Sequence, residues 1–158
     1  MDNVSERQGD AMRTVIGTAS IVLALGWMAT TAGQAKPALE AFGHYEQIRV
    51  ALSNDTLAET AKHAKALAPL AGAVAGTAAK KAADQLAAAK TLEDARIHFG
   101  DLSAALVPKF QSEGIPGAHA YMCPMKQKPW MQRGDTMSNP YFGKAMATCG
   151  SPLAPQAK

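Results

Sequence analysis

Sulfur and imidazole side chains gather in two short stretches near the end of this 158-residue chain. The first stretch, residues 119–125, reads His-Ala-Tyr-Met-Cys-Pro-Met. If it is extended, His119, Cys123 and Met125 share one face, because alternate side chains of a strand point the same way. Pro124 lacks an amide N–H, so the stretch is predicted to be an edge strand or a loop.

The second stretch, residues 146–150, reads Met-Ala-Thr-Cys-Gly and is predicted to end a short helix. Asn139 suits the N-cap of that helix, Pro140 its first position, and Gly150 the position just past its end. On such a helix Met146 and Cys149 are three residues apart and lie on one face.

These residue types indicate a site for a soft metal ion. Thiolate and thioether ligands favour Cu(I), whereas oxygen donors suit calcium or magnesium. We therefore predict Cu(I) or Ag(I) as the bound ion, with His44 on the first helix as an alternative source of an imidazole. The predicted ligands are Cys123, Met125, Met146 and Cys149, with His119 as a weaker fifth. The side chains predicted to hold the motif closed are Tyr121, Trp130, Asn139 and Tyr141.

The same cysteines also fit a structural disulfide, in which case no metal cofactor is expected. Closing a Cys123–Cys149 loop of about 27 residues would stabilise the fold by roughly 3–4 kcal/mol. The protein would then be a non-metal interaction module of the cell envelope. Met131 and Met137 are interpreted as adaptable packing residues, and His63, between two lysines, is expected on a solvated helix face.

Composition and motifs exclude several other classes of protein. The chain is 47% hydrophobic and 18% charged with a net charge of +3, which suits one globular domain and shows no basic, aromatic-rich stripe for nucleic acid. It lacks the Gly-x-Ser-x-Gly, phosphate-loop, His-Glu-x-x-His and Cys-x-x-Cys motifs. We therefore expect that it is not an enzyme.

The first 35 residues have the pattern of a secretory signal peptide. A basic start after Met12 precedes an apolar run over 15–29, and small residues at Gly33 and Ala35 suit cleavage. Residues 1–11 are acidic, so Met12 is a candidate for the true start. We expect export to the periplasm, with no membrane attachment after cleavage and two free cysteines available for oxidation or ligation.

The region 36–110 is predicted to be a helical bundle, followed by the Cys/Met segment 111–150 and a disordered tail over 151–158. A break at 53–55, a capping box at Thr56 and Glu59, and glycines near residue 76 divide the Ala-rich region. Thr91 is predicted to cap a last helix that ends before Pro108. The predicted fold is all-α, an antiparallel up-and-down bundle of about four helices.

The chain also resembles a known bacterial domain family in its motif residues. The C-terminal part of the match is Cys123-Pro124-Met125, Trp130, the run 139–143 (Asn-Pro-Tyr-Phe-Gly), Met146 and Cys149-Gly150. The upstream part is Tyr45, Ile48, Leu52, Asp55, Arg96, Phe99, Leu102 and Ser103. That family, a domain of unknown function, often occurs with, or as the C-terminal extension of, periplasmic adaptor proteins of copper and silver efflux pumps.

The resemblance implies a small exported helical domain linked to the handling of heavy metals, chiefly copper. The segment 126–129 (Lys-Gln-Lys-Pro) is shorter and more basic than is usual in that family. Taken with the ligand types, the resemblance leads us to expect a periplasmic copper-binding protein. It would buffer the ion or pass it to a heavy-metal efflux pump or its adaptor.

Overall fold

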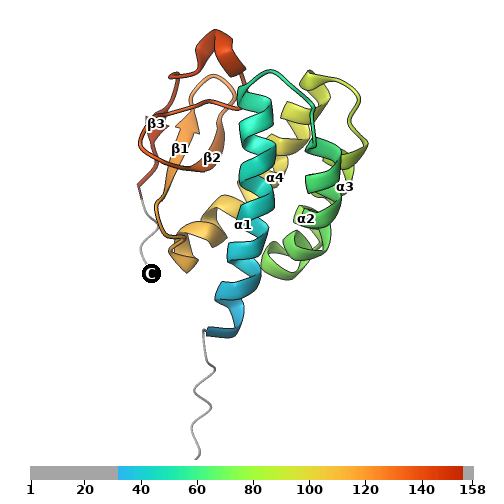
Figure 1. Ribbon diagram of the computed structural model, residues 1–158. Coiled ribbons are helices and arrows are strands. Elements are labelled where there is room, and N and C mark those ends of the chain that lie inside the picture. Colours follow the sequence, from blue (N-terminus) through green and yellow to red (C-terminus); the bar gives the residue numbers. More distant parts are fainter. Residues whose placement is uncertain (1–31, 155–158) are drawn as a thin grey trace, which may run out of the picture.

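The computed structural model describes residues 32–154, with side chains from Lys36 onward (Figure 1). The predicted leader over 1–35 therefore lies almost entirely outside the described residues, as do residues 155–158. The elements in chain order are α1 (Ala32–Ser53), α2 (Thr60–Ala75), α3 (Thr77–Ala88), α4 (Leu92–Glu113), β1 (Ala118–Cys123), β2 (Lys128–Arg133), the 3-10 helix η1 (Gly143–Met146) and β3 (Ser151–Pro152). Within 32–154, no helix combines the length and the apolar character needed to cross a bilayer.

The all-α prediction is wrong, because the region after α4 forms an antiparallel sheet with strand order β2-β1-β3. A turn over 124–127 joins β1 to β2, and Tyr121 pairs with Trp130 across the two strands, their rings stacked with centroids 5.3 Å apart. Pro129 is tolerated because β2 is an edge strand. Ser151–Pro152 pair with β1 rather than lying in the tail that the sequence indicated.

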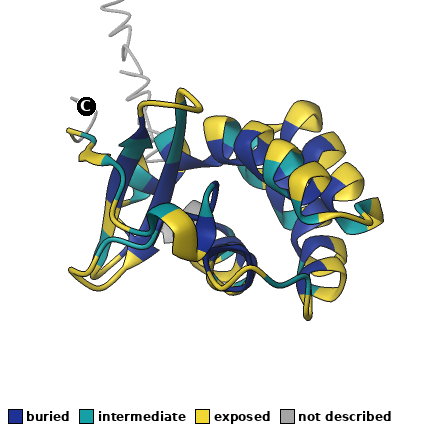
Figure 2. Ribbon diagram, turned by 90° about the horizontal axis from the view of Figure 1, so that it is seen from above, coloured by how far each residue is buried: buried dark blue, intermediate teal, exposed yellow. Residues whose placement is uncertain are grey.

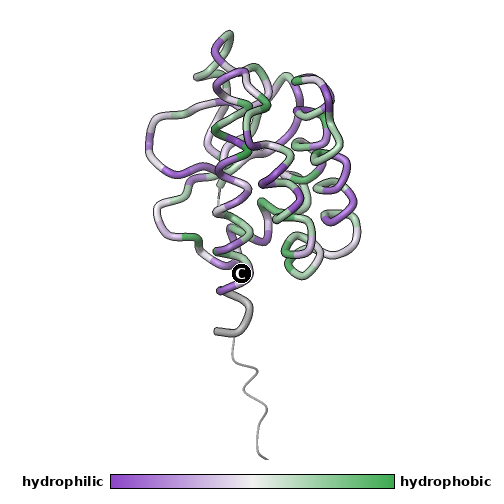
Figure 3. The backbone as a smooth tube through the Cα atoms, turned by 45° about the vertical axis from the view of Figure 1, so that its right-hand side comes forward, coloured by the Kyte–Doolittle hydropathy of each residue, from purple (hydrophilic) through white to green (hydrophobic). Residues whose placement is uncertain are grey.

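The elements are arranged in layers, with α1 and α4 between the sheet and the α2–α3 pair (Figures 1 and 2). β2 packs on α4 and α1, while α2 and α3 pack on each other and on the opposite side of the central helices. Buried residues line the facing surfaces of these layers, and apolar and polar positions alternate along each helix (Figure 3). The helical bundle therefore offers one of its sides to the Cys/Met segment.

Helix ends show which local signals decide the structure. The break after Ser53, the division of the Ala-rich region at Gly76, and the Thr91 cap are confirmed, with Asp94 N donating to Thr91 Oγ1 at 3.1 Å. The capping box is wrong, because α2 begins at Thr60 and Glu59 adopts a positive φ of 60° without a side-chain cap bond.

The predicted end of the last helix before Pro108 is also wrong, because α4 continues through Pro108 to Glu113. Proline at 108 cannot donate to the carbonyl of Ala104, but Ala104 is exposed, so water can take that bond. Beyond Pro108, the buried Phe110 ties the last turns of the helix to the core. Packing therefore outweighs the local cost of the proline.

Tyr45 of α1 is fully buried and connects the two central helices with strand β2. Its ring stacks on Phe99 of α4, with centroids 4.9 Å apart. Its hydroxyl lies 2.8 Å from Ser103 Oγ and accepts a hydrogen bond of 3.3 Å from Met131 N in β2. Burial raises the pKa of the Tyr45 hydroxyl well above its usual value, so the hydroxyl is protonated at neutral pH.

Replacing Tyr45 by Phe should test this contact. The ring stays, but the Met131 N–H and the Ser103 hydroxyl lose their partner while buried, so we expect a loss of about 1–3 kcal/mol in the free energy of unfolding. Urea denaturation measures it. Ser112→Ala removes an exposed hydroxyl of α4 and should change stability by less than about 0.5 kcal/mol. Equal effects from both variants would contradict the assignment.

His63 of α2 differs from its expected solvated position, because it is half-buried against His44 of α1. The two Nδ1 atoms lie 3.0 Å apart, so one neutral ring donates and the other accepts. Partial burial, the His44 ring and the neighbouring Lys62 all lower the pKa of His63, and Glu59 opposes them weakly. The α1–α2 contact is therefore made with His63 neutral.

This lowered pKa predicts acid sensitivity. Between the folded pKa of His63 and the unfolded value of about 6.5, the unfolded chain binds more protons, so stability falls as the pH is lowered through that window. Thermal melts from pH 8 to pH 5 should show a falling Tm. The fall should be smaller in His63→Gln, and an identical pH profile in that variant would contradict the prediction.

Candidate functional site

One buried amide side chain, that of Asn139, brings the two cysteines to the same place. Its Nδ2 donates to the carbonyl oxygen of Cys149 at 2.6 Å and lies 3.5 Å from Cys123 Sγ. Its Oδ1 accepts from Tyr141 N at 2.8 Å. Asn139 is fully buried. The end of β1 and the segment after η1 are thus held together through a single side chain whose polar atoms are all used.

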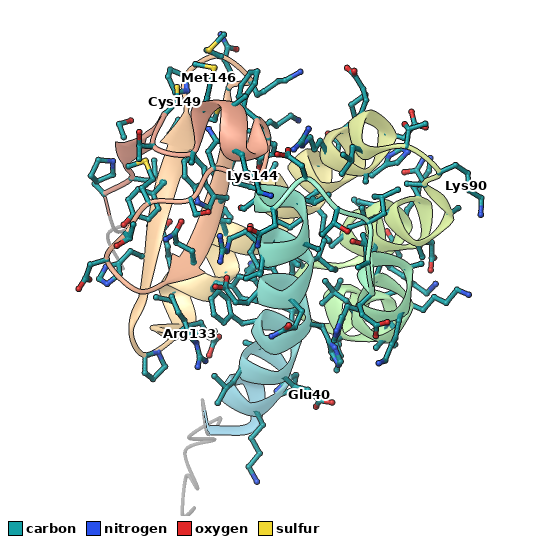
Figure 4. All side chains as sticks on the ribbon, turned by 45° about the horizontal axis from the view of Figure 1, so that its top comes forward. Glu40, Lys90, Arg133, Lys144, Met146 and Cys149 are labelled. Atoms are coloured by element: carbon teal, nitrogen blue, oxygen red, sulfur yellow. The ribbon has the colours of Figure 1, made fainter. Side chains whose placement is uncertain are left out.

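The short helix expected over 139–150 is reduced to the single 3-10 turn η1. Asn139 still binds the backbone two residues ahead, as an Asn that starts a turn does, and its own carbonyl accepts from Gly143 N at 3.1 Å. Gly143 then adopts a φ of 56°, which ends any α-helical path through this point. Cys149 N donates to Met146 O at 3.1 Å, so these two residues remain neighbours at one end of the molecule, as Figure 4 shows.

A second sulfur atom near Cys149 was not expected from the sequence. A Cβ built on Gly150 would lie 2.9 Å from Met137 Sδ and would collide with the Trp130 indole. Gly150 therefore has no room for a side chain, and the Met137 thioether lies beside the backbone that follows Cys149. The sequence predicts only a packing role for Met137, because Met137 stands twelve residues before Cys149 and no spacing rule links the two residues.

The chain before Asn139 is fixed by buried polar groups of α1 and β2. Arg49 is 6% exposed; its guanidinium binds Glu46 through two nitrogens at 2.9 Å each and also donates to Ser138 O at 3.2 Å. Ser53 Oγ donates to the same carbonyl at 3.0 Å. Gln132 Oε1 accepts from Ser138 N at 3.0 Å. Both backbone groups of Ser138 are therefore bound, which sets the position of Asn139.

The chain after Asn139 is fixed by an ion pair between Asp55 and Arg96. Arg96 Nε donates to the carbonyl of Pro140 at 3.0 Å, while its Nη2 binds the Asp55 carboxylate. Asp55 Oδ2 accepts from Lys144 N at 3.1 Å, and the Arg96 bond holds the pKa of Asp55 below its usual value. A Cβ on Gly143 would collide with this pair. Glycine is therefore required there for space as well as for conformation.

The aromatic residues expected to support the motif also pack together. Tyr121 stacks on Trp130, and the Trp130 ring meets Tyr141 edge-on with centroids 6.1 Å apart. The Tyr141 hydroxyl donates to the carbonyl of Pro129, and burial raises the pKa of that hydroxyl well above its usual value. The sheet face next to Cys123 is consequently apolar and closed.

The predicted ligands occupy different environments. Cys123 is fully buried, while Cys149 and Met146 are half-buried, and both cysteines are free thiols in the structure. Met125 lies in the turn over 124–127 and is 60% exposed. His119 pairs with Gln132 near the opposite end of β1 from Cys123, which pairs with Lys128.

His119 is therefore separated from the cysteines by most of the strand. Four residues of β-strand span about 13 Å, and the His119 imidazole instead lies 3.4 Å from the Asp135 carboxylate. Figure 4 shows the same separation, with Arg133 at the end of β2 far from Met146 and Cys149. The Asn139 amide contacts Cys123 Sγ and the Cys149 backbone, and Met146 and Met137 lie beside the chain at Cys149 and Gly150. His119 lies outside this region.

Comparisons with known proteins give no assignment: no protein-family model, curated protein or solved structure matches the chain. In the described part of the chain, no group of three or more His, Cys, Asp or Glu side chains converges as a metal site would require. The candidate site is thus defined by its sulfur atoms and by the contacts of Asn139.

Removing the Asn139 amide should loosen the site. Asn139→Ala leaves the Cys149 carbonyl and the Tyr141 N–H without partners, and we expect a loss of about 2–4 kcal/mol in the free energy of unfolding. The buried Cys123 thiol should also react faster with a disulfide reagent such as dithionitrobenzoate. Asn54→Ala, which removes an exposed amide bonded to Val50 O, is the matched control. Wild-type stability and wild-type thiol reactivity in Asn139→Ala would contradict this role.

Proposed function

We propose that the protein binds a soft metal ion, Cu(I), through Cys123 and Cys149 with thioether sulfur from Met146 or Met137. The observation that carries the proposal is the position of the Asn139 amide, which contacts Cys123 Sγ and the Cys149 carbonyl at the same time. Met146 is hydrogen-bonded to Cys149 through the backbone, and the Met137 thioether lies beside Gly150, so both thioethers belong to the same region of the fold. Sulfur donors of these kinds favour Cu(I).

The surroundings of Cys123 suit a thiolate ligand that is formed on metal binding. A thiol must lose its proton before it binds a metal, and burial opposes the free thiolate. The Asn139 Nδ2–H group directed at Cys123 Sγ would stabilise negative charge on that sulfur. A bound cation would neutralise the charge of the thiolate that this contact supports.

Location and partner follow from the sequence rather than from the geometry. The signal-like segment over 1–35 supports export to the periplasm. The resemblance to domains that accompany copper and silver efflux adaptors supports a role in buffering the ion or transferring it to such a system. Met125 lies on the turn next to Cys123 and is 60% exposed. Its thioether could bind an ion at the surface before the ion enters the site.

A second candidate function uses the same juxtaposition of cysteines. In an oxidising compartment Cys123 and Cys149 can join as a disulfide, which would fix the segment after η1 to the end of β1. The protein would then be a non-metal interaction module of the envelope. A disulfide and a pair of thiolate ligands exclude one another, so the redox state of the two sulfurs separates the two functions.

A Cu(I) titration against bicinchoninate, before and after reduction of the thiols, tests the proposal. The reduced protein should withdraw one Cu(I) per chain from the chelator. Cys123→Ser and Cys149→Ser should each weaken binding by about 100-fold or more, because loss of even a residue that only supports a metal ligand costs about 10–100-fold. Met146→Leu and Met137→Leu should show which thioether contributes.

Two variants serve as controls for this titration. Met122 lies in β1 next to Cys123 but on the opposite face of the sheet, so Met122→Leu should leave Cu(I) affinity unchanged. His119→Gln should also leave it unchanged, because His119 lies at the far end of β1. Absence of competition by the reduced protein, or full binding by the double Cys→Ser chain, would overturn the proposal and favour the disulfide-bonded module.

A further inference from the structure

The imidazoles of His44 and His63 face one another nitrogen to nitrogen across the α1–α2 contact. Their Nδ1 atoms are 3.0 Å apart and their ring centroids 5.3 Å apart. An imidazole nitrogen lies only about an ångström from its ring centre, so the two Nδ1 atoms lie almost on the line between the centroids. The lone pairs at Nδ1 are therefore directed into the same small space.

This space is accessible from solvent. Both histidines are half-buried, so a small ion can reach the Nδ1 atoms. The charged groups that act on His63 are Lys62 and Glu59, which bind one another at 2.6 Å, so their charges largely offset one another there.

The histidine pair is separate from the sulfur site. His44 contacts α2, whereas its neighbour Tyr45 contacts β2 on the other side of α1. The sulfur atoms belong to the sheet side and to the end of the molecule near η1 (Figure 4). Occupation of one site therefore does not require the other.

We propose that His44 and His63 form a second metal site, which takes an imidazole-binding transition ion of the Cu(II) or Zn(II) type. Imidazole suits these ions, and Cu(II) binds most tightly among the divalent first-row metals. At a metal–nitrogen distance of about 2.0–2.1 Å, two nitrogen ligands at a right angle lie about 2.9 Å apart, close to the 3.0 Å between the Nδ1 atoms. Each half-buried ring must therefore rotate, so that its lone pair turns from the other nitrogen toward the ion.

The proton balance of this step is simple. In the empty pair one ring carries its proton on Nδ1 and the other accepts it. When the ion enters, the donor ring moves that proton to Nε2, so both Nδ1 lone pairs are free and no net proton is released by the neutral pair. Water completes the coordination. Acid weakens binding because protonated imidazole is not a ligand.

Cu(II) titration of the full chain carrying Cys123→Ser and Cys149→Ser tests this site without interference from the thiols. We expect one Cu(II) per chain, with an electron paramagnetic resonance spectrum that shows nitrogen ligands. Adding His44→Gln or His63→Gln should weaken binding at least tenfold. His98→Gln, a histidine of α4 outside both sites, should leave affinity unchanged. Circular dichroism confirms that each variant is folded.

A second readout is the effect of Zn(II) on thermal stability in the same cysteine-free chain. A ligand of the folded state raises Tm as its concentration exceeds Kd, so Zn(II) should raise Tm in this chain and not after His63→Gln. Undiminished Cu(II) binding in both histidine variants, or absence of nitrogen ligands and of any Zn(II)-dependent rise in Tm, would overturn the proposal. Because this chain has no cysteines, a negative result would not affect the proposal that the cysteines bind Cu(I). Likewise, failure of Cu(I) binding would not affect the proposed site at His44 and His63.

Discussion

The fully buried amide of Asn139 is the interaction on which the C-terminal half of the structure depends. It joins the end of β1, the start of the η1 segment and Cys149, two residues before β3, through three contacts. A buried amide whose polar atoms are all bound fixes one arrangement, because any alternative leaves unpaired groups in an apolar space. The positions of Cys123 and Cys149 are a consequence of that constraint.

The helical layer supplies the rigid support for this arrangement. Arg49 and Ser53 of α1 bind the carbonyl of Ser138, and Arg96 of α4 binds that of Pro140. The residues on either side of Asn139 are thus held by two different helices. Asp55, Arg96 and Gly143 come from distant parts of the chain and form one set of contacts. The bundle and the sheet are parts of a single packed unit.

Local signals predicted the helices better than the sheet. The break after Ser53, the division at Gly76 and the Thr91 cap depend on backbone preferences within a few residues. They can therefore be predicted from the sequence directly. The strands of β1 and β2 are six residues long and are buried on both faces near Tyr121 and Met131, which hides the alternation that would identify them. Two local signals gave wrong predictions. α4 continues past Pro108 because the packing of Phe110 outweighs the local cost of the proline. Thr56 and Glu59 do not cap a helix, because α2 begins only at Thr60.

The candidate site could be predicted only in part. Residue type alone predicts three of the sulfur ligands, Cys123, Cys149 and Met146. The place of Asn139 before Pro140 predicts that it starts a turn or helix. The proximity of Cys123 and Cys149 depends on the tertiary contacts of Asn139, and His119 lies near the other end of β1 from Cys123. Met137 and the His44–His63 pair gave no signal, because each acquires its neighbour through tertiary packing rather than through spacing along the chain.

X-ray absorption at the copper edge of the reduced, Cu(I)-loaded protein tests most directly whether sulfur atoms of Cys123 and Cys149 bind the ion. We expect a first coordination shell of sulfur alone, with fewer sulfur ligands when Cys123 is replaced by Ser. A shell made of nitrogen or oxygen, or a sulfur shell that is the same without both cysteines, would contradict it.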